Sequence, residues 1–225
     1  METVSYLIVG GGVAGTTAAE TIRAHDREGS IAIVSDEPHR LYSRLSLSKA
    51  NFFLEKLPLE KIWLKNEKWY EEEEIALLAG KKAAILDPTG KEITLEGGQK
   101  IGYEKLLLAI GGTPNRWNAP GSAKEGVFYM RTLDDAKNIM VSAGSAKRAI
   151  ITGGGFIGFE MAEMLKLSGV GVTLIIRKSH YWDPTLDKES GQMIEAALEK
   201  GGVEIIRNME ADVVLGEEKV EGVQL

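Results

Sequence analysis

The residues of this sequence whose type and spacing most directly indicate a function are glycines in two clusters. Each has the pattern G-x-G-x-x-G after a short apolar run, and the glycines are Gly10, Gly12 and Gly15, then Gly153, Gly155 and Gly158. In such a loop the first glycine permits a tight turn, the second lets backbone approach a pyrophosphate, and the third lets a helix pack on a strand. The helix that follows directs unpaired N–H groups and the positive end of its dipole toward the phosphates. Two loops therefore predict two bound dinucleotides, and the competing interpretation is two tight turns in an ordinary α/β fold. The sites also include the residues within each loop, Val13, Ala14, Phe156 and Ile157.

The residues that would bind each ribose differ between the two halves. An acid about 20 residues beyond the glycines usually binds the ribose hydroxyls. In the first half Asp36, with Glu37 beside it, favours a ribose without a 2′-phosphate, as in FAD or NAD. In the second half the matching strand is followed by Arg177 and Lys178, so cations stand where an acid is expected. A guanidinium suits a 2′-phosphate, so NADPH is favoured over NADH, and the alternative is a solvated strand end.

The elements that must position these loops alternate between apolar strands and amphipathic helices, which predicts βαβ units and a parallel sheet. In the first half we predict strands at 6–9, 31–35, 83–86, 92–95 and 105–110, and helices at 13–24 and 66–74. Residues 111–126 are rich in glycine and proline and form a predicted linker. In the second half we predict strands at 149–152, 172–176, 203–207, 213–215 and 220–225, and helices at 133–142, 156–167 and 186–200. The predicted fold class is α/β with two Rossmann-like dinucleotide-binding units.

Composition excludes several classes of function. The chain has no cysteine, which excludes a disulfide framework, thiolate metal sites and a redox-active cysteine pair. The net charge is −6 and no long basic run exists, so nucleic-acid binding has little support. His25, His39 and His180 lack metal-ligand spacing, and we expect them to be surface or capping residues and the chain to bind no metal. No apolar run is long enough to span a bilayer, and we expect a cytoplasmic protein that does not associate with membranes.

Taken together, the two loops and four further segments resemble the FAD-dependent pyridine nucleotide oxidoreductases, in the branch of ferredoxin, rubredoxin and putidaredoxin reductases. Residues 40–49 are similar to a family segment that ends in Arg-x-x-Leu-Ser-Lys, and here they read RLYSRLSLSK. Residues 103–111 are similar to a strand and turn that end in Ala-Thr-Gly, although Ile110 replaces the threonine. Residues 131–136 and the run Gly158-Phe159-Glu160 complete the similarity.

The resemblance implies a role for each matching position. Residues 1–118 would form an FAD-binding domain and residues 119–225 an NAD(P)-binding domain. Lys49, near the flavin ring, and Glu160, near the nicotinamide–flavin stack, are the predicted catalytic residues. The lysine cation could stabilise the negative charge of a reduced flavin. The implied FAD contacts are the ribose for Asp36, the pyrophosphate for Arg44, the adenine for the backbone at Ala83, and further parts of the cofactor for Ala109, Gly111 and Arg131.

The function implied is hydride transfer from NAD(P)H to FAD, followed by electron transfer to an external acceptor such as a small iron–sulfur or rubredoxin-type carrier. The resemblance also implies a C-terminal truncation, because relatives continue through the rest of the NAD(P) domain and return to the FAD domain. We therefore keep a truncated, non-catalytic dinucleotide-binding module as the alternative. An NAD(P)-only dehydrogenase has the least support, because no catalytic Lys, Tyr or His stands in a recognisable dehydrogenase arrangement.

Overall fold

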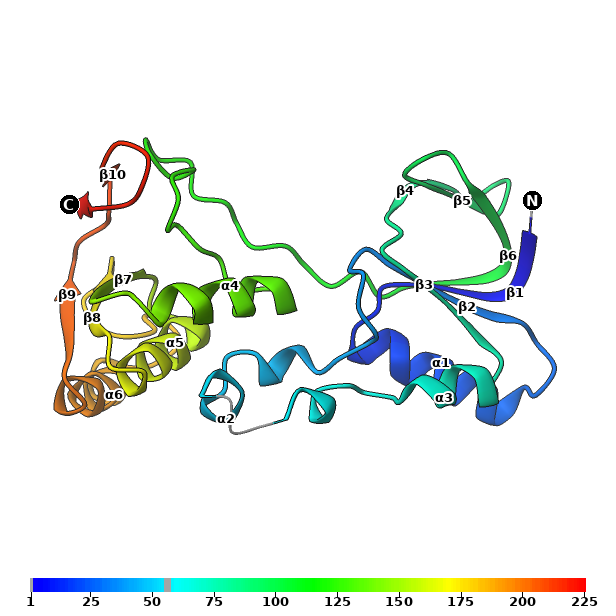
Figure 1. The fold of residues 1–225 in the computed structure, drawn as a ribbon, viewed down its shortest axis with the longest axis horizontal. Helices are drawn as coiled ribbons and strands as arrows, with labels where there is room; N and C mark the ends of the chain where they lie inside the picture. The colour runs from blue at the N-terminus through cyan, green and yellow to red at the C-terminus, as the bar shows by residue number, and fades with distance from the viewer. Residues whose placement is uncertain (1, 55–57) are drawn as a thin grey trace. The chain divides into compact units, whose positions relative to one another are not determined.

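The computed structural model describes residues 2–54 and 58–225, and these fall into two compact units (Figure 1). Unit 1 consists of Met1–Arg44 and Leu59–Thr113, and unit 2 of Leu45–Pro58 and Pro114–Leu225. The short segment Leu45–Pro58, which contains the helix α2 (Ala50–Phe53), thus packs with the second half of the chain. The domain boundary expected near residue 118 stays a prediction.

Unit 1 is built on a six-stranded sheet with the order β3-β2-β1-β6-β5-β4. Its four parallel strands are β1 (Glu2–Val9), β2 (Ile31–Ser35), β3 (Ile75–Ala79) and β6 (Lys100–Leu108). The strands β4 (Ala83–Asp87) and β5 (Glu92–Leu95) join the edge of β6 in antiparallel pairs. The strand β1, which the first glycine loop follows, therefore has a neighbour on each side.

Both faces of the sheet in unit 1 are covered. Successive side chains of a strand point to opposite faces, and Ile8 and Ile33 pack with Ala19 of α1 (Val13–His25) and Tyr70 of α3 (Glu67–Glu72). The alternate residues, including Leu7 and Val34, pack with side chains from β5 and β6. Figure 1 shows α1 and α3 on one side of the sheet and the β4–β5 ribbon on the other.

Unit 2 contains a smaller parallel sheet with the order β7-β8-β9. Its strands are β7 (Arg148–Thr152), β8 (Gly171–Ile176) and β9 (Val203–Arg207), and its longer helices are α4 (Leu133–Ala143), α5 (Phe156–Leu167) and α6 (Lys188–Lys200). The core lies between the helices and one sheet face, and it includes Met161, Met164 and Leu165 of α5. A two-stranded ribbon, β10 (Val213–Leu215) with β11 (Gly222–Gln224), follows β9.

Most elements expected from the sequence are present, several with identical bounds. Thr132 caps α4 as expected, because its hydroxyl accepts from the backbone N–H of Asp135. Two expectations in unit 1 were wrong. Residues 75–79, for which no strand was predicted, form β3, and β6 begins at Lys100 and ends at Leu108 rather than spanning 105–110. Within residues 2–54 and 58–225, no helix combines the length and apolar character that crossing a membrane requires.

Candidate dinucleotide-binding sites

The first glycine loop joins β1 to α1, and its three glycines meet different surroundings. A Cβ on Gly10 would lie 2.0 Å from the carbonyl oxygen of Ala109, and one on Gly15 would lie 2.0 Å from that of Gly10. A Cβ on Gly12 would meet no protein atom within 4 Å. The first and third glycines are therefore required by packing, whereas the second keeps open a space outside the protein. A dinucleotide pyrophosphate fits this arrangement, because Gly12 is also the N-cap of α1.

The second loop joins β7 to α5 in the same way. Gly155 is the N-cap of α5, and a Cβ there would again meet nothing within 4 Å. A Cβ on Gly158 would lie 2.2 Å from the carbonyl oxygen of Gly153, so the third glycine again permits close packing of helix and loop. The residues inside the loop, Phe156 and Ile157, are exposed. This loop therefore also fits a pyrophosphate.

The second loop opens into a groove of about 1700 Å³ in unit 2. Ile150, Thr173 and Ile175 line it from the strands, Arg177 and Lys178 from the end of β8, and Trp182 and Asp183 from the loop that follows. The groove follows β7, which pairs only with β8 among the strands of the described chain. Ile150 is accordingly 43% exposed.

Two of the unit 1 side chains predicted to bind the ribose and the pyrophosphate, Glu37 and Arg44, interact with each other. Asp36 lies exposed just past β2, where a ribose hydroxyl could reach it. Glu37 forms an ion pair with Arg44 at 2.6 Å and accepts a hydrogen bond of 2.5 Å from the hydroxyl of Tyr42. Arg44 also donates to the Tyr42 hydroxyl at 3.1 Å. Glu37 therefore serves to hold Arg44, and Asp36 is the better candidate for the ribose.

Three further positions implied by the resemblance lie in unit 1. The backbone N–H of Ala109 donates to the carbonyl oxygen of Val9 at 2.7 Å, which places the end of β6 against the first glycine loop. Gly111 has a φ of 63°, a backbone conformation that glycine adopts at no steric cost. Ala83 begins β4, where it pairs with Leu95. Ala109 thus lies directly beside Gly10, and its predicted contact with FAD stays a prediction.

The structure brings together Lys49 and Glu160, the two predicted catalytic residues, within unit 2. The ammonium of Lys49 forms an ion pair with Glu160 of α5, and the hydroxyl of the buried Ser48 donates to the same carboxylate. The Lys49 side chain remains 55% exposed and that of Glu160 21% exposed. A cation thus lies beside the second turn of α5.

Arg131, Arg177 and Lys178 are the other charged residues predicted for the sites in unit 2. The backbone N–H of Arg131 donates to Asp135 at 3.1 Å, just before α4. Arg177 and Lys178 are exposed at the end of β8, and Arg177 forms a loose ion pair with Glu210 at 3.8 Å. Because both cations line the groove that holds the glycine loop, they are accessible to a nucleotide phosphate.

Three side chains near the loops were missed or misassigned in the sequence. His180 was expected at the surface or as a cap, but it is buried, with Nε2 3.0 Å from the carbonyl oxygen of Leu186. Thr16 and Tyr181 were not identified, yet the hydroxyl of each donates to the carbonyl oxygen of a second glycine, at 3.0 Å to Gly12 and 2.6 Å to Gly155. Thr16 could have been found from its position four residues beyond Gly12. Tyr181 has no such local signal.

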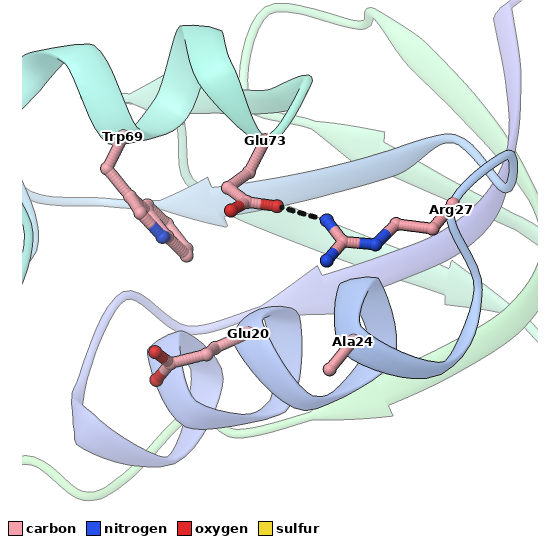
Figure 2. Close-up of a pocket in the computed structure, with 5 residues that line it drawn as sticks. All are labelled: Glu20, Ala24, Arg27, Trp69 and Glu73. Atoms are coloured by element: carbon pink, nitrogen blue, oxygen red, sulfur yellow. Dashed lines mark hydrogen bonds and ion pairs between the residues drawn. The ribbon is translucent and has the colours of Figure 1, made fainter.

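A smaller depression in unit 1, of about 220 Å³, lies between α1 and α3 (Figure 2). Arg27 forms an ion pair with Glu73 across it at 3.1 Å. Glu20 pairs with Lys65 at 2.5 Å, and the ammonium of Lys65 lies 5.0 Å from the centre of the Trp69 ring. The charged groups of this depression are thus already paired within the protein. No group of three or more potential metal ligands occurs among the residues that the structure describes.

Comparison with known proteins agrees with this geometry. A family model described as pyridine nucleotide-disulphide oxidoreductase matches residues 4–225. The ferredoxin–NAD(+) reductase component of a biphenyl dioxygenase system from Paraburkholderia xenovorans is 31% identical over 96% of this chain and 52% of its own length. The NADH-rubredoxin oxidoreductase of Clostridium acetobutylicum is 29% identical over 92% of this chain and 53% of its own length. The reductase in a putidaredoxin reductase–putidaredoxin complex superposes with a TM-score of 0.92 at 27% identity, over 99% of this chain and 55% of that one. The chain thus spans about half the length of these relatives.

Proposed function

The chain belongs to the pyridine nucleotide-disulphide oxidoreductase family, and from this premise we propose that it binds FAD at Gly10–Gly15 and NAD(P)H at Gly153–Gly158 as an oxidoreductase. The observation that carries the proposal is the pair of loops, each with a second glycine whose Cβ position is open. A bound flavin would supply the redox chemistry, accepting a hydride from the nicotinamide and releasing electrons singly. These 225 residues contain no cysteine, so the acceptor we propose is external and not a disulfide formed among them.

The protein's own contribution is positioning and charge. In unit 1, Asp36 would bind the adenosine ribose, and Glu37 would hold the Arg44 guanidinium ready for the pyrophosphate. Ala83, Ala109, Gly111 and Arg131 are proposed as further FAD contacts. In unit 2, the N–H groups at the start of α5 would bind the nicotinamide nucleotide, and Glu160 would keep the Lys49 ammonium in place. That cation would favour negative charge that develops on a ligand bound nearby.

The nicotinamide preference is a separate part of the proposal. Ile176 ends β8 where an acid would bind the 2′-hydroxyl of NADH, and the exposed Arg177 and Lys178 follow it. We therefore propose that this chain favours NADPH over NADH. The names of the biphenyl dioxygenase reductase component and of the rubredoxin oxidoreductase refer to NAD(+) or NADH, so this preference would distinguish the chain from those two relatives. Arg177→Ala should lower the affinity for NADPH and leave the affinity for NADH unchanged. Equal affinities of the unsubstituted protein for ADP-ribose with and without the 2′-phosphate would refute the preference.

The acceptor we propose is a small electron-carrier protein. The relatives named above act with ferredoxin or rubredoxin by their names, and one structural neighbour is a complex with putidaredoxin. A flavin suits this role, because it takes two electrons at once and passes them on one at a time. The competing proposal is a dinucleotide-binding module without turnover, and the experiment below separates the two.

A visible spectrum of the purified protein, taken with and without added FAD, tests the proposal. We expect a flavin absorption band that bleaches when NADPH or NADH is added under nitrogen and returns when a dye acceptor is supplied. Protein that stays colourless after reconstitution with FAD would refute the proposal. Protein that binds FAD and NAD(P)H but reduces no dye would favour the module without turnover.

A further inference from the structure

The carbonyl oxygen of the second glycine in each loop accepts two hydrogen bonds. In unit 1 the carbonyl of Gly12 accepts from the backbone N–H of Thr16 at 3.0 Å and from the Thr16 hydroxyl at 3.0 Å. In unit 2 the carbonyl of Gly155 accepts from the backbone N–H of Phe159 at 3.1 Å and from the hydroxyl of Tyr181 at 2.6 Å. The helix position that carries the hydroxyl in unit 1 is therefore a phenylalanine in unit 2. A residue 26 positions along the chain supplies the missing donor.

This second donor has a consequence for anion binding. The peptide group is planar, so fixing the carbonyl of Gly155 also fixes the direction of the N–H of Phe156, which points the opposite way. That N–H is among the first four of α5, which have no acceptor within the helix and are the groups that bind a phosphate. The hydrogen bond that the Tyr181 hydroxyl donates also offsets part of the negative charge on the Gly155 carbonyl oxygen, which would otherwise repel a phosphate bound nearby.

Tyr181 is itself held by a chain of buried contacts. Its backbone N–H donates to Glu195 at 2.5 Å, and Glu195, which is only 1% exposed, accepts from Arg207 at 2.7 Å. A Cβ on Gly191 would lie 2.7 Å from the Tyr181 carbonyl oxygen, so α6 approaches this segment closely. A buried carboxylate is costly unless it is paired, and here the pairing fixes the backbone of Tyr181.

The side chain of Tyr181 is suited to donate. It is 2% exposed, and its ring lies edge-on to Phe159 with 6.2 Å between the ring centres. Burial, together with the nearby charge of Glu160, raises the pKa of Tyr181 to about 12, so the hydroxyl keeps its proton in any working buffer.

We propose that Tyr181 is a positioning residue for the nicotinamide nucleotide, holding the Gly155 carbonyl so that the start of α5 faces the pyrophosphate. Glu195 and Arg207 support it by fixing its backbone. This inference rests on the proposed function, since it presumes that the second loop binds a nicotinamide nucleotide.

The test compares Tyr181→Phe with Tyr103→Phe, which removes a hydroxyl from a buried ring in unit 1. The dissociation constants for NADPH, NADH and ADP-ribose are measured by calorimetry on the whole chain, along with the unfolding midpoint without ligand. We expect Tyr181→Phe to lower the affinity for all three ligands, because all three contain the pyrophosphate. The decrease should be about 2- to 10-fold, which is the range for the loss of one net hydrogen bond. Tyr103→Phe should leave them unchanged. In dye-reduction assays the KM for the nucleotide should rise in Tyr181→Phe while kcat stays the same.

The outcomes separate this inference from the proposed function. If the unsubstituted protein binds the nucleotides and Tyr181→Phe binds them equally well, the positioning role is refuted and the proposed function stands. If the unsubstituted protein binds none of them, both are refuted. Should Tyr181→Phe fail to fold, Glu195→Gln retains the hydroxyl and loosens its support, and unchanged affinity in that variant would count against the role.

Discussion

The two units use the same loop in different surroundings, and the difference shows which features belong to the ligand and which to the packing. In unit 1 the strand β1, which precedes the first glycine loop, lies between β2 and β6, and both faces of its sheet are covered. In unit 2 the strand β7, which precedes the second glycine loop, has β8 as its one neighbour in the described chain, and a groove runs along it. The open Cβ position of the second glycine is common to both loops, so it is the feature expected from ligand binding.

The first glycine shows the effect of the surroundings. Gly10 and Gly153 have φ values of 122° and 121°, so both need the freedom of glycine. Only Gly10 is also crowded, because the end of β6 places Ala109 against it, whereas a Cβ on Gly153 would meet nothing within 4 Å. The positive φ thus explains on its own why Gly153 is a glycine, whereas Gly10 is a glycine because of both its positive φ and its close packing against Ala109.

The largest expected effect follows from that contrast. Gly10→Ala should destabilise unit 1 by about 1–3 kcal/mol more than Gly153→Ala destabilises unit 2, because it adds a clash to the backbone strain. Hydrogen exchange of the β1 and β7 amides measures the two units separately. Equal losses of protection in the two variants would show that the packing of β6 against the loop is not the cause.

The second glycines should affect binding and leave folding intact. Gly12 and Gly155 have negative φ values of −88° and −106° and open Cβ positions, so alanine fits the protein at both. The added methyl group should instead clash with the ligand and lower its affinity roughly 10- to 100-fold. We expect Gly12→Ala to lose FAD and Gly155→Ala to lose NAD(P)H, as measured by flavin content and calorimetry. A loss of both ligands in either variant would contradict the assignment of one dinucleotide to each loop.

These glycines could be assigned from the sequence because the signal is local. A strand, a loop and a helix follow one another within a few residues, and their order is enough to predict the loop. The strand β3 could not be assigned in this way, since Ile75–Ala79 has residues that also favour helix and follows an acidic run. It becomes a strand because β2 offers it an edge, with Ile31 paired to Ile75.

The residues of the candidate site likewise differ in whether a local sequence signal identifies them. Lys49 and Glu160 were proposed from a resemblance, and their pairing across 111 residues has no local signal. The contact of Tyr181 with Gly155 depends on the packing of α6 and on the chain after β8, so spacing alone could not predict it. Sequence reasoning thus finds groups that a motif carries and misses partners that only the tertiary fold brings together.

A smaller effect is expected at Thr16, the counterpart of Tyr181. Thr16→Val keeps the shape of the side chain and the backbone bond to Gly12 but removes the hydroxyl that donates to it. FAD affinity should fall about 2- to 10-fold, and NAD(P)H affinity should not change. An FAD dissociation constant equal to that of the unsubstituted protein would mean that the second hydrogen bond matters in one loop at most.

A further effect is a dependence of stability on alkaline pH that separates the two hydroxyls. Thr16 does not titrate, whereas burial and the charge of Glu160 raise the pKa of Tyr181 to about 12. A group whose pKa is raised on folding stabilises the protein fully below its unfolded pKa of about 10, and this contribution is lost as pH rises toward the folded value. Between pH 10 and 12 the free energy of unfolding should therefore fall less steeply in Tyr181→Phe than in the unsubstituted protein. Urea unfolding at several pH values measures this, with Thr16→Val as the control that keeps the full slope. Parallel slopes in all three proteins would show that the Tyr181 hydroxyl is not buried in the way its contact with Gly155 requires.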